Sequence, residues 1–235
     1  MYKVVVFDVG DTLIGYEPNQ VAAIIDRFHS IGVDMTMDEA TKINQTMELS
    51  IAEQIWREIN DAPRIDDTEF ATYINNQILL LPFVKEKIAT LQMQEMFMAT
   101  PIRVPQRKIV KPNTYSVLTQ LRQKYRLGII SNYSASMLDY LQEAELTEYF
   151  ETIIISEIVG YEKPDPKIYE YFLAKMKCEA KDCLYVGDHP FDVMGAKRAG
   201  MYVAWLNQIY ENLPEYISER PDYIIQDIGE LTLIL

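Results

Sequence analysis

The sequence predicts an α/β protein that has a doubly wound parallel sheet and a smaller helical domain. Short apolar runs rich in β-branched residues recur along most of the chain, and amphipathic helical patterns lie between the later runs. Between residues 17 and 100 the strand signals are absent and helical patterns replace them. Because strands that alternate with helices pair in parallel through right-handed crossovers, the runs outside that segment are expected to form one sheet.

Six apolar runs are the predicted strands. Each run is short and continuous rather than alternating, which is typical of strands that are buried on both faces. The runs are Val4 to Phe7, Leu127 to Ile130, Ile153 to Ile155, Leu184 to Val186, Met201 to Leu206 and, more weakly, Tyr223 to Ile225.

Helical patterns fill the intervals between the later runs. Asn113 is the predicted N-cap of one helix, and Asp165 before Pro166 places a capping carboxylate ahead of a proline at the first helical position of another. The apolar positions that carry these patterns are Val117, Leu118 and Leu121, then Leu138 and Leu141, then Ile168, Tyr171 and Phe172.

Residues 17–100 are expected to form a small helical bundle inserted after the first strand. The predicted domains are therefore an α/β core of residues 1–16 and 101–235 and a helical domain of residues 17–100. Such an insert is either a lid over a site or packing beside it. Its three apolar stripes are Val21, Ile24, Ile25 and Phe28; Ile43, Met47, Ile51, Ile55 and Ile59; and Phe70, Tyr73, Ile74, Ile78 and Leu81.

The segment from residue 101 to 111 is basic and contains no acidic residue. We expect it to be a solvated linker, and a role in guiding an acidic substrate is the alternative. It contains Pro101, Arg103, Pro105, Arg107, Lys108 and Lys111.

Composition excludes several classes of partner. The chain has 22 basic and 35 acidic side chains, a net charge of −13, which opposes attraction to nucleic acid and anionic lipid. Cys178 and Cys183 fit no disulfide framework and are expected to be small core residues in a reducing compartment.

The start of the sequence has no signal pattern and no apolar run is long enough to span a bilayer, so we expect a soluble, cytoplasmic protein.

Polar residues follow three of the predicted strands at the points where the strands end. In an open parallel sheet, ligands bind beyond the carboxyl ends of the strands, so three such endings predict one shared site. The residues are Asp8, Gly10, Asp11 and Thr12 after the first run, Ser131 and Asn132 after the second, and Gly187 and Asp188 after the fourth, with Asp192 four residues further on.

The acidic residues at these strand ends predict a metal. Four carboxylates, those of Asp8, Asp11, Asp188 and Asp192, cannot all stay ionised close together without a cation. Oxygen ligands with retained waters suit Mg²⁺, which also neutralises phosphate oxygens. Lys163, in the loop after the third run, is placed to add a fixed positive charge, although a lone loop lysine would be interpreted as solvated.

These motifs, taken together and in order, resemble those of a known family. DxxxT at residues 8–12, Ser131-Asn132, Lys163-Pro164 and GDxxxD at residues 187–192 resemble the four motifs of the haloacid dehalogenase (HAD) superfamily. The resemblance extends from residue 4 to about 206, and the helical insert resembles the cap of many members. It implies a Rossmann-like core, a mobile cap that closes over the substrate and catalysis through an aspartyl intermediate.

The resemblance also implies a role for each motif residue. Asp8 would be the nucleophile, and Asp8, Asp188 and the backbone carbonyl of Gly10 would hold Mg²⁺, with Asp192 supporting the metal directly or through water. Ser131 and Asn132, with Lys163, would hold the phosphoryl oxygens of the substrate. Thr12, counted with Ser131 and Asn132 among the substrate-binding residues, would fix the turn after the first strand.

The first motif departs from the usual pattern of the superfamily. Most of its phosphatases read DxDGT, in which the second aspartate protonates the leaving group, whereas this sequence reads DVGDT and has Gly10 at that position. A general acid typically contributes about 10² to 10⁴ in rate. Three explanations stay open: Asp11 reaches the site because Gly10 loosens the turn, the leaving group needs little protonation, or the reaction is not phosphomonoester hydrolysis.

The predicted function is Mg²⁺-dependent, phosphatase-like hydrolysis of a small phosphorylated molecule. A catalytically silent binding protein is the alternative from another class, motivated by Gly10. Dehalogenases and phosphonatases of the superfamily also lack the second aspartate, but haloacid dehalogenases do not need the acids that Asp188 and Asp192 resemble. A phosphonatase would need a lysine in the cap that forms a Schiff base. The helical insert offers Lys42, Lys85 and Lys87, but none of them stands in a recognisable motif. The sequence identifies neither the substrate nor the oligomeric state.

Overall fold

The structure is a computed structural model that describes residues 2–101 and 106–235. The chain divides into two compact units. The first, here called the sheet unit, contains the residues up to Gly15 and Lys108–Leu235. The second, the helical unit, is Tyr16–Arg107.

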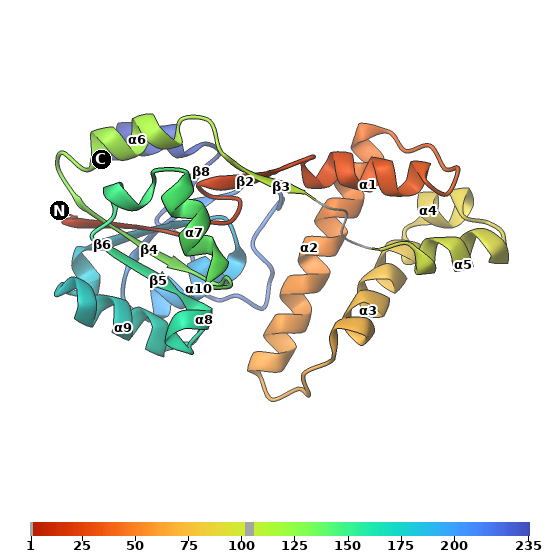
Figure 1. Cartoon of the computed structure of the whole chain (residues 1–235). Coiled ribbons are helices and arrows are strands. Elements are labelled where there is room, and N and C mark those ends of the chain that lie inside the picture. Colours follow the sequence, from red (N-terminus) through yellow and green to blue (C-terminus); the bar gives the residue numbers. More distant parts are fainter. Residues whose placement is uncertain (1, 102–105) are drawn as a thin grey trace. The chain divides into compact units, whose positions relative to one another are not determined.

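The sheet unit is built on six parallel strands in the order β5-β4-β1-β6-β7-β8 (Figure 1). This order confirms the predicted doubly wound α/β fold, because β1 lies in the middle and later strands extend the sheet on both sides of it. In register, Val6 of β1 lies opposite Gly128 of β4 and Tyr185 of β6. The strands are β1 (Val4–Phe7), β4 (Arg126–Ser131), β5 (Thr152–Ile155), β6 (Cys183–Gly187), β7 (Tyr202–Leu206) and β8 (Tyr223–Ile225).

Helices cover both faces of this sheet, which explains why the middle residues of its strands are mostly apolar. Val5 and Phe7 of β1 pack in a core with α6 and α7, whereas Val4 and Val6 pack in a second core with α9 and α10. Neighbouring residues of a strand point to opposite faces, so a strand buried on both sides has no polar position. The helices are α6 (Thr114–Leu121), α7 (Ser136–Glu143), α8 (Ser156–Val159), α9 (Pro166–Met176), α10 (Pro190–Arg198) and α11 (Leu231–Ile234), with 3-10 turns at Thr147–Tyr149, Ala180–Asp182 and Ile228–Glu230.

The two predicted helix starts have different outcomes. The carboxylate of Asp165 accepts the backbone N–H of Lys167 at 2.9 Å and caps α9, as predicted. Asn113 stands at the N-cap position of α6, as predicted, but its side chain makes no capping hydrogen bond. Its backbone is left-handed, with φ 66°, and its side-chain amide donates to the Asp227 carboxylate at 3.1 Å instead.

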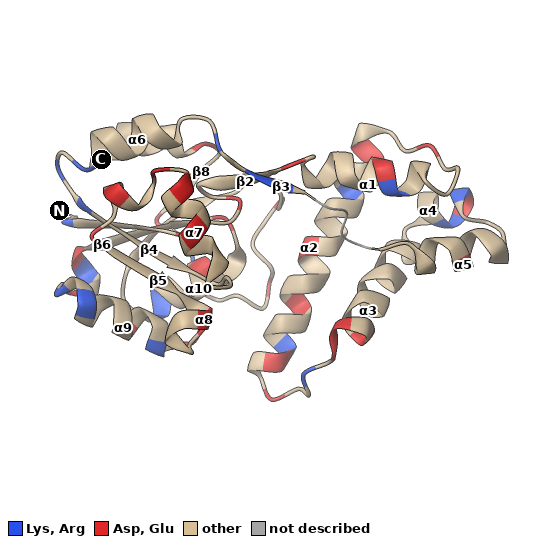
Figure 2. Ribbon diagram, viewed as in Figure 1, with Lys and Arg blue, Asp and Glu red and all other residues tan. Residues whose placement is uncertain are grey.

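The described residues of the helical unit form five helices around an apolar core of their own. The three stripes predicted from the sequence fall on α1, α2 and α3, and their inward residues include Phe28, Ile43 and Ile78, each fully buried. Acidic residues recur along α2 and α3 (Figure 2). The helices are α1 (Gln20–His29), α2 (Met37–Ile59), α3 (Asp67–Leu80), α4 (Pro82–Lys87) and α5 (Leu91–Ala99).

Two short strands were not predicted. β2 (Ile14–Glu17) and β3 (Arg107–Val110) pair with each other in a separate two-stranded sheet. The predicted solvated linker was therefore wrong for Arg107–Val110, where two charged residues precede only two apolar ones and give no continuous apolar run. Arg103 and Pro105 lie outside the described residues.

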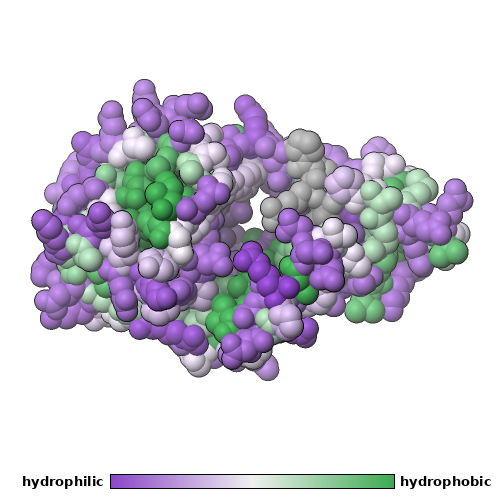
Figure 3. Space-filling model, turned by 60° about the horizontal axis from the view of Figure 1, so that its bottom comes forward, coloured by the Kyte–Doolittle hydropathy of each residue, from purple (hydrophilic) through white to green (hydrophobic). Residues whose placement is uncertain are grey.

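Hydrophilic side chains cover most of the face drawn in Figure 3, and hydrophobic residues form separate patches on it. Within the part of the chain that the structure describes, we find no helix with the length and apolarity that crossing a membrane requires.

Candidate active site

Three neighbouring strands of the sheet unit deliver the predicted site residues to one edge. Asp8 follows β1, Ser131 ends β4, and Asp188 follows β6. Because β1 lies between the other two strands and runs parallel to both, all three residues lie at the same end of the sheet. The backbone N–H of Asp8 donates to the carbonyl of Val186 at 2.8 Å, which extends the β1–β6 pairing up to Asp8.

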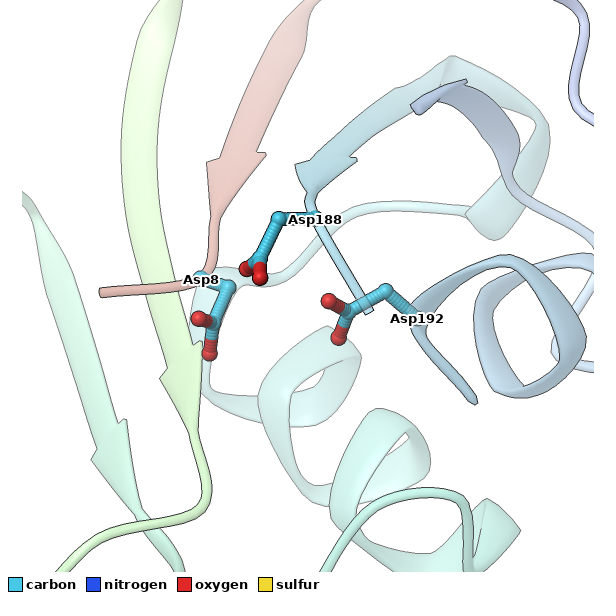
Figure 4. A group of neighbouring side chains, drawn as sticks. All are labelled: Asp8, Asp188 and Asp192. Carbon is cyan, nitrogen blue, oxygen red and sulfur yellow. The ribbon is translucent and has the colours of Figure 1, made fainter. Parts of the chain in front are cut away.

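The carboxylates of Asp8, Asp188 and Asp192 form a compact cluster (Figure 4). One oxygen from each side chain lies within 4.8 Å of the others. Asp192 is 1% exposed and Asp8 7%, whereas Asp188 is half-buried. A set of hard oxygen donors at this spacing fits a divalent cation such as Mg²⁺.

Lys163 joins two of these carboxylates. Its Nζ lies 2.6 Å from Oδ1 of Asp8 and 2.6 Å from Oδ1 of Asp192, and it also donates to the Tyr185 hydroxyl at 3.1 Å. The lysine is only 8% exposed. Burial by itself would lower the pKa of Lys163, but the carboxylates of Asp192 and Asp8 outweigh burial and raise the pKa above its ordinary value, so the ammonium stays charged.

One ammonium does not neutralise three carboxylates. Burial raises the pKa of Asp8, Lys163 opposes that rise, and Asp192 adds to it. The pKa of Asp188 is raised well above its ordinary value by burial and by the charges of its acidic neighbours, although a hydrogen bond from Thr12 lowers it. The fully ionised cluster therefore requires a further cation.

These shifts predict how stability depends on pH and metal. A raised pKa in the folded state means that the folded protein holds the Asp188 proton more tightly than the unfolded chain does, so the metal-free protein loses stability as pH rises from about 4 through that raised pKa. Mg²⁺ binds the deprotonated carboxylates, so we expect it to raise Tm more at about pH 8 than at about pH 5. Thermal unfolding followed by circular dichroism, with a chelator or with Mg²⁺, measures this difference.

The matched control for that prediction is Asp188→Asn. An amide does not titrate in this range, so the variant should gain less from Mg²⁺ and its gain should depend less on pH. Equal gains by the two proteins at both pH values would contradict a metal site at Asp188.

Two of the three predicted substrate-binding residues, Thr12 and Asn132, have contacts that position other site groups. The Thr12 hydroxyl, which is fully buried, donates to Oδ1 of Asp188 at 3.0 Å. The Asn132 side chain pairs twice with the backbone of Lys163: Nδ2 donates to the carbonyl at 2.8 Å, and Oδ1 accepts the N–H at 2.7 Å. Thr12 therefore orients an acid, and Asn132 holds the loop that carries Lys163. Ser131 is 1% exposed at the end of β4.

Asp11 lies beside the cluster but is not one of its three members. Its side chain is exposed, and Lys111 Nζ donates to its backbone carbonyl at 2.6 Å. The pKa of the Asp11 carboxyl is raised because protein groups displace part of its surrounding water and because Asp8 repels its charge, while Lys111 opposes the rise. The strained residue of this turn is Asp11 itself, at φ 50°. Gly10 forms an isolated bridge with Ile14.

Two further residues shape the site: Gly187, already among the predicted strand-end residues, and His189, which was not. A Cβ at position 187 would lie 2.3 Å from Oδ2 of Asp192, so only glycine lets that carboxylate turn back toward the strand end. His189 Nδ1 accepts the backbone N–H of Phe191 at 3.2 Å and caps α10. Burial and the charge of Lys163 lower the pKa of His189 to about 4, so the ring is neutral at neutral pH.

This fold and this cluster define a class of α/β proteins in which acidic residues gather at the carboxyl ends of parallel strands. Residues 2–200 match the family model of the haloacid dehalogenase-like hydrolases, and the chain belongs to that family. The family expected from the four motifs is confirmed. The enzyme class is confirmed with it, because curated relatives with matching sequences are phosphatases and dehalogenases.

Two curated relatives illustrate the range of the family. The chain is 27% identical to the glyceraldehyde 3-phosphate phosphatase of Methanothermobacter thermautotrophicus over 254 aligned positions, which cover 100% of both chains. It is 34% identical to the pyrimidine 5'-nucleotidase YjjG of Escherichia coli (strain K12) over 127 residues, 53% of this chain and 56% of that protein. The match therefore spans about half the length of the nucleotidase.

Solved structures share the fold. YfnB of Bacillus subtilis, in a crystal form bound to magnesium, superposes with a TM-score of 0.64 at 21% identity and covers 100% of this chain and 98% of its own. The L-2-haloacid dehalogenase of Xanthobacter autotrophicus with chloropropionic acid covalently bound gives a TM-score of 0.61 at 19% identity, with 100% and 98% covered. At these identities the likeness concerns the fold alone.

Proposed function

We propose that this hydrolase is a Mg²⁺-dependent phosphatase that cleaves a small phosphorylated metabolite through an aspartyl-phosphate on Asp8. The observation that carries the proposal is the contact of Asp8 with Lys163 inside a cluster of three carboxylates. The full-length similarity to a glyceraldehyde 3-phosphate phosphatase supports phosphoryl chemistry on a small substrate.

The chain's own residues would carry out two successive displacements. In the first, a carboxylate oxygen of Asp8 forms a bond to phosphorus, the bond from phosphorus to the ester oxygen breaks, and the departing oxygen takes a proton from water or from an acid of the site and leaves as the alcohol. In the second, a water oxygen forms a bond to phosphorus and gives up a proton to solvent, and the bond from phosphorus to the Asp8 oxygen breaks, which releases inorganic phosphate and regenerates the carboxylate. Lys163, with Ser131 and Asn132 at the neighbouring strand end, would hold the phosphoryl oxygens.

The acids beside Asp8 would hold the metal. We propose Asp8, Asp188, the Gly10 carbonyl and Asp192 as the groups that hold Mg²⁺, with Asp192 acting directly or through water while it also anchors Lys163. Bound Mg²⁺ would neutralise phosphoryl oxygens and so stabilise the charge that develops during transfer. We further propose that the helical unit is a cap that selects the substrate.

A panel of phosphate esters with and without Mg²⁺ tests this function. Alkyl phosphates, sugar phosphates and aryl phosphates should be compared, and at least one should turn over with Mg²⁺ and stop when a chelator is added. Failure of every ester, aryl phosphates included, would remove the phosphatase proposal.

The double substitution Gly10→Asp with Asp11→Gly tests whether a missing acid limits the rate. It restores the usual order of the motif, and glycine at position 11 suits the left-handed backbone found there, at φ 50°. If the acid is what the site lacks, turnover of alkyl phosphates should rise by tenfold or more, within the range of about 10² to 10⁴ that general acids contribute. Aryl phosphates, which have good leaving groups, provide the internal comparison and should change little.

Unchanged or lower alkyl phosphate turnover in the double variant would mean that the acid is already supplied or is not needed. The single variant Gly10→Asp separates the two halves of the change, since it adds the acid and keeps Asp11.

Gly10 also favours a second candidate, a catalytically silent member of the fold that binds a phosphorylated ligand. Binding of inorganic phosphate without turnover of any ester would support it. Metal-independent release of halide from a 2-haloacid would instead support a dehalogenase, an activity named for a relative that is 33% identical over 110 residues.

A further inference from the structure

One buried tyrosine lies within hydrogen-bonding distance of three groups beneath the site. The Tyr185 hydroxyl is 3.1 Å from Nζ of Lys163, 3.1 Å from Oδ1 of Asp192 and 2.9 Å from the carbonyl of Ile130. The residue lies in the middle of β6 and is 0% exposed. A tyrosine hydroxyl has one proton, so it accepts from the ammonium and donates to either the carboxylate or the carbonyl.

This hydroxyl completes the hydrogen bonding of Lys163. An ammonium has three N–H donors, and three acceptors lie within reach: Asp8 and Asp192 at 2.6 Å and Tyr185 at 3.1 Å. Three acceptors fix the rotation of the ammonium about its bond to Cε. Without the third acceptor, the ammonium would keep its hydrogen bonds to the two carboxylates, but its rotation and its position between them would be less restricted.

We propose that Tyr185 is a positioning residue that holds the Lys163 ammonium against Asp8 and orients the Asp192 carboxylate. The proposal rests on the proposed function for its effect on turnover, whereas its structural part is independent of any substrate. Tyr185 acts through Lys163 and Asp192. In metal sites, hydrogen-bonding partners of this kind typically change affinity or activity by about 10- to 100-fold when they are removed.

A second tyrosine provides the matched control. Tyr169 on α9 is also 0% exposed, and its ring lies 6.0 Å from that of Tyr185, centroid to centroid. Its hydroxyl has no hydrogen-bond partner within residues 2–101 and 106–235. Replacing either tyrosine with phenylalanine keeps the ring and removes one buried hydroxyl, but only the Tyr185 hydroxyl is hydrogen-bonded to Lys163 and Asp192.

The first measurement is independent of turnover. In the wild-type protein, the ¹⁵N-labelled Lys163 ammonium, assigned with a Lys163→Arg sample, should exchange its protons slowly and show a nuclear Overhauser effect to the Tyr185 ring. Tyr185→Phe should shift the ¹⁵N signal and accelerate the exchange, and Tyr169→Phe should leave both unchanged. A wild-type ammonium without that Overhauser effect overturns the proposal, even if a variant fails to fold.

The second measurement is the kinetics of an aryl phosphate with Mg²⁺. Tyr185→Phe should lower kcat/KM by about 10- to 100-fold, with most of the loss in kcat, and Tyr169→Phe should stay within about twofold of wild type. Equal kinetics of the two variants overturn the proposal. If the wild-type protein hydrolyses no ester but the ammonium signal responds as expected, the proposed function fails and the positioning role stands.

Discussion

Replacing Asp8 with asparagine is expected to lower kcat by about 10⁴-fold or more for every ester that the wild-type protein hydrolyses. An amide is a far weaker nucleophile than a carboxylate, while it keeps the shape of the side chain and an oxygen that accepts from Lys163. The substitution also removes one negative charge from a crowded, buried cluster. The metal-free variant should therefore unfold at the same temperature as the wild-type protein or at a higher one. Steady-state kinetics and thermal unfolding measure the two effects.

Asp182→Asn is the control, because it makes the same chemical change at the opposite end of β6, the strand that pairs with β1. Asp182 immediately precedes β6 and pairs on the surface with Lys3 at 2.8 Å. This variant should keep turnover within about twofold of wild type, because exposed ion pairs contribute little. If Asp8→Asn retained a tenth of the wild-type rate, the nucleophile would have to be another group.

The convergence of the site was predictable because it follows from strand direction alone. Asp8 and Ser131 come directly after an apolar run and Asp188 comes one residue after another, and parallel strands place their carboxyl ends along one edge. The observed order, with β1 between β4 and β6, brings these three ends next to one another. Short local patterns and one general rule of topology were sufficient for this part.

The features that the sequence did not predict depend on contacts between side chains that no local sequence pattern connects. Tyr185 lies in an apolar strand and resembles any other core residue in sequence, yet its hydroxyl reaches Lys163, 22 positions away in the chain. Asn113 is of a residue type favoured at N-caps and stands at that position, but its side chain donates a hydrogen bond to Asp227, 114 positions away. The role of Gly187 becomes visible only when the carboxylate of Asp192 is seen to occupy the space of the missing Cβ.

The turn after β1 is an intermediate case. The sequence located the departure from the usual motif at Gly10 and raised the possibility that glycine loosens the turn. The positive φ is found at Asp11, where an aspartate tolerates the left-handed conformation better than most residues do. The unusual order of the two residues therefore places the strain on the acid whose role is in question, and the double substitution tests that residue directly.

Lys163→Met is expected to lower the free energy of unfolding by about 3–5 kcal/mol, because it leaves Asp8 and Asp192 buried without their counter-ion. Without the ammonium, which opposes the effect of burial, the folded-state pKa of Asp8 rises further, so the folded variant binds protons more tightly than the unfolded chain does. The loss of stability should therefore be smallest at low pH and grow as pH rises above about 4. Turnover should fall by about 10² to 10³ if the ammonium stabilises the transferring phosphoryl group. Chemical denaturation over a series of pH values measures the first effect.

Lys197→Met is the control for Lys163→Met. It makes the same substitution in a more exposed ion pair, so the difference between the two losses of stability measures the effect of burial. Lys197 pairs with Asp222 at 2.9 Å, but about a quarter of each side chain is exposed, 27% and 26%, and removal of such a pair should cost about 1 kcal/mol or less. A similar small loss for Lys163→Met would mean that water reaches the carboxylates beside it, and the buried ion pair would then be a wrong description of the site. A large loss that Mg²⁺ partly reverses would instead support two conclusions. The first is that the ion pair is buried, and the second is that a divalent cation at the same carboxylates replaces the missing charge.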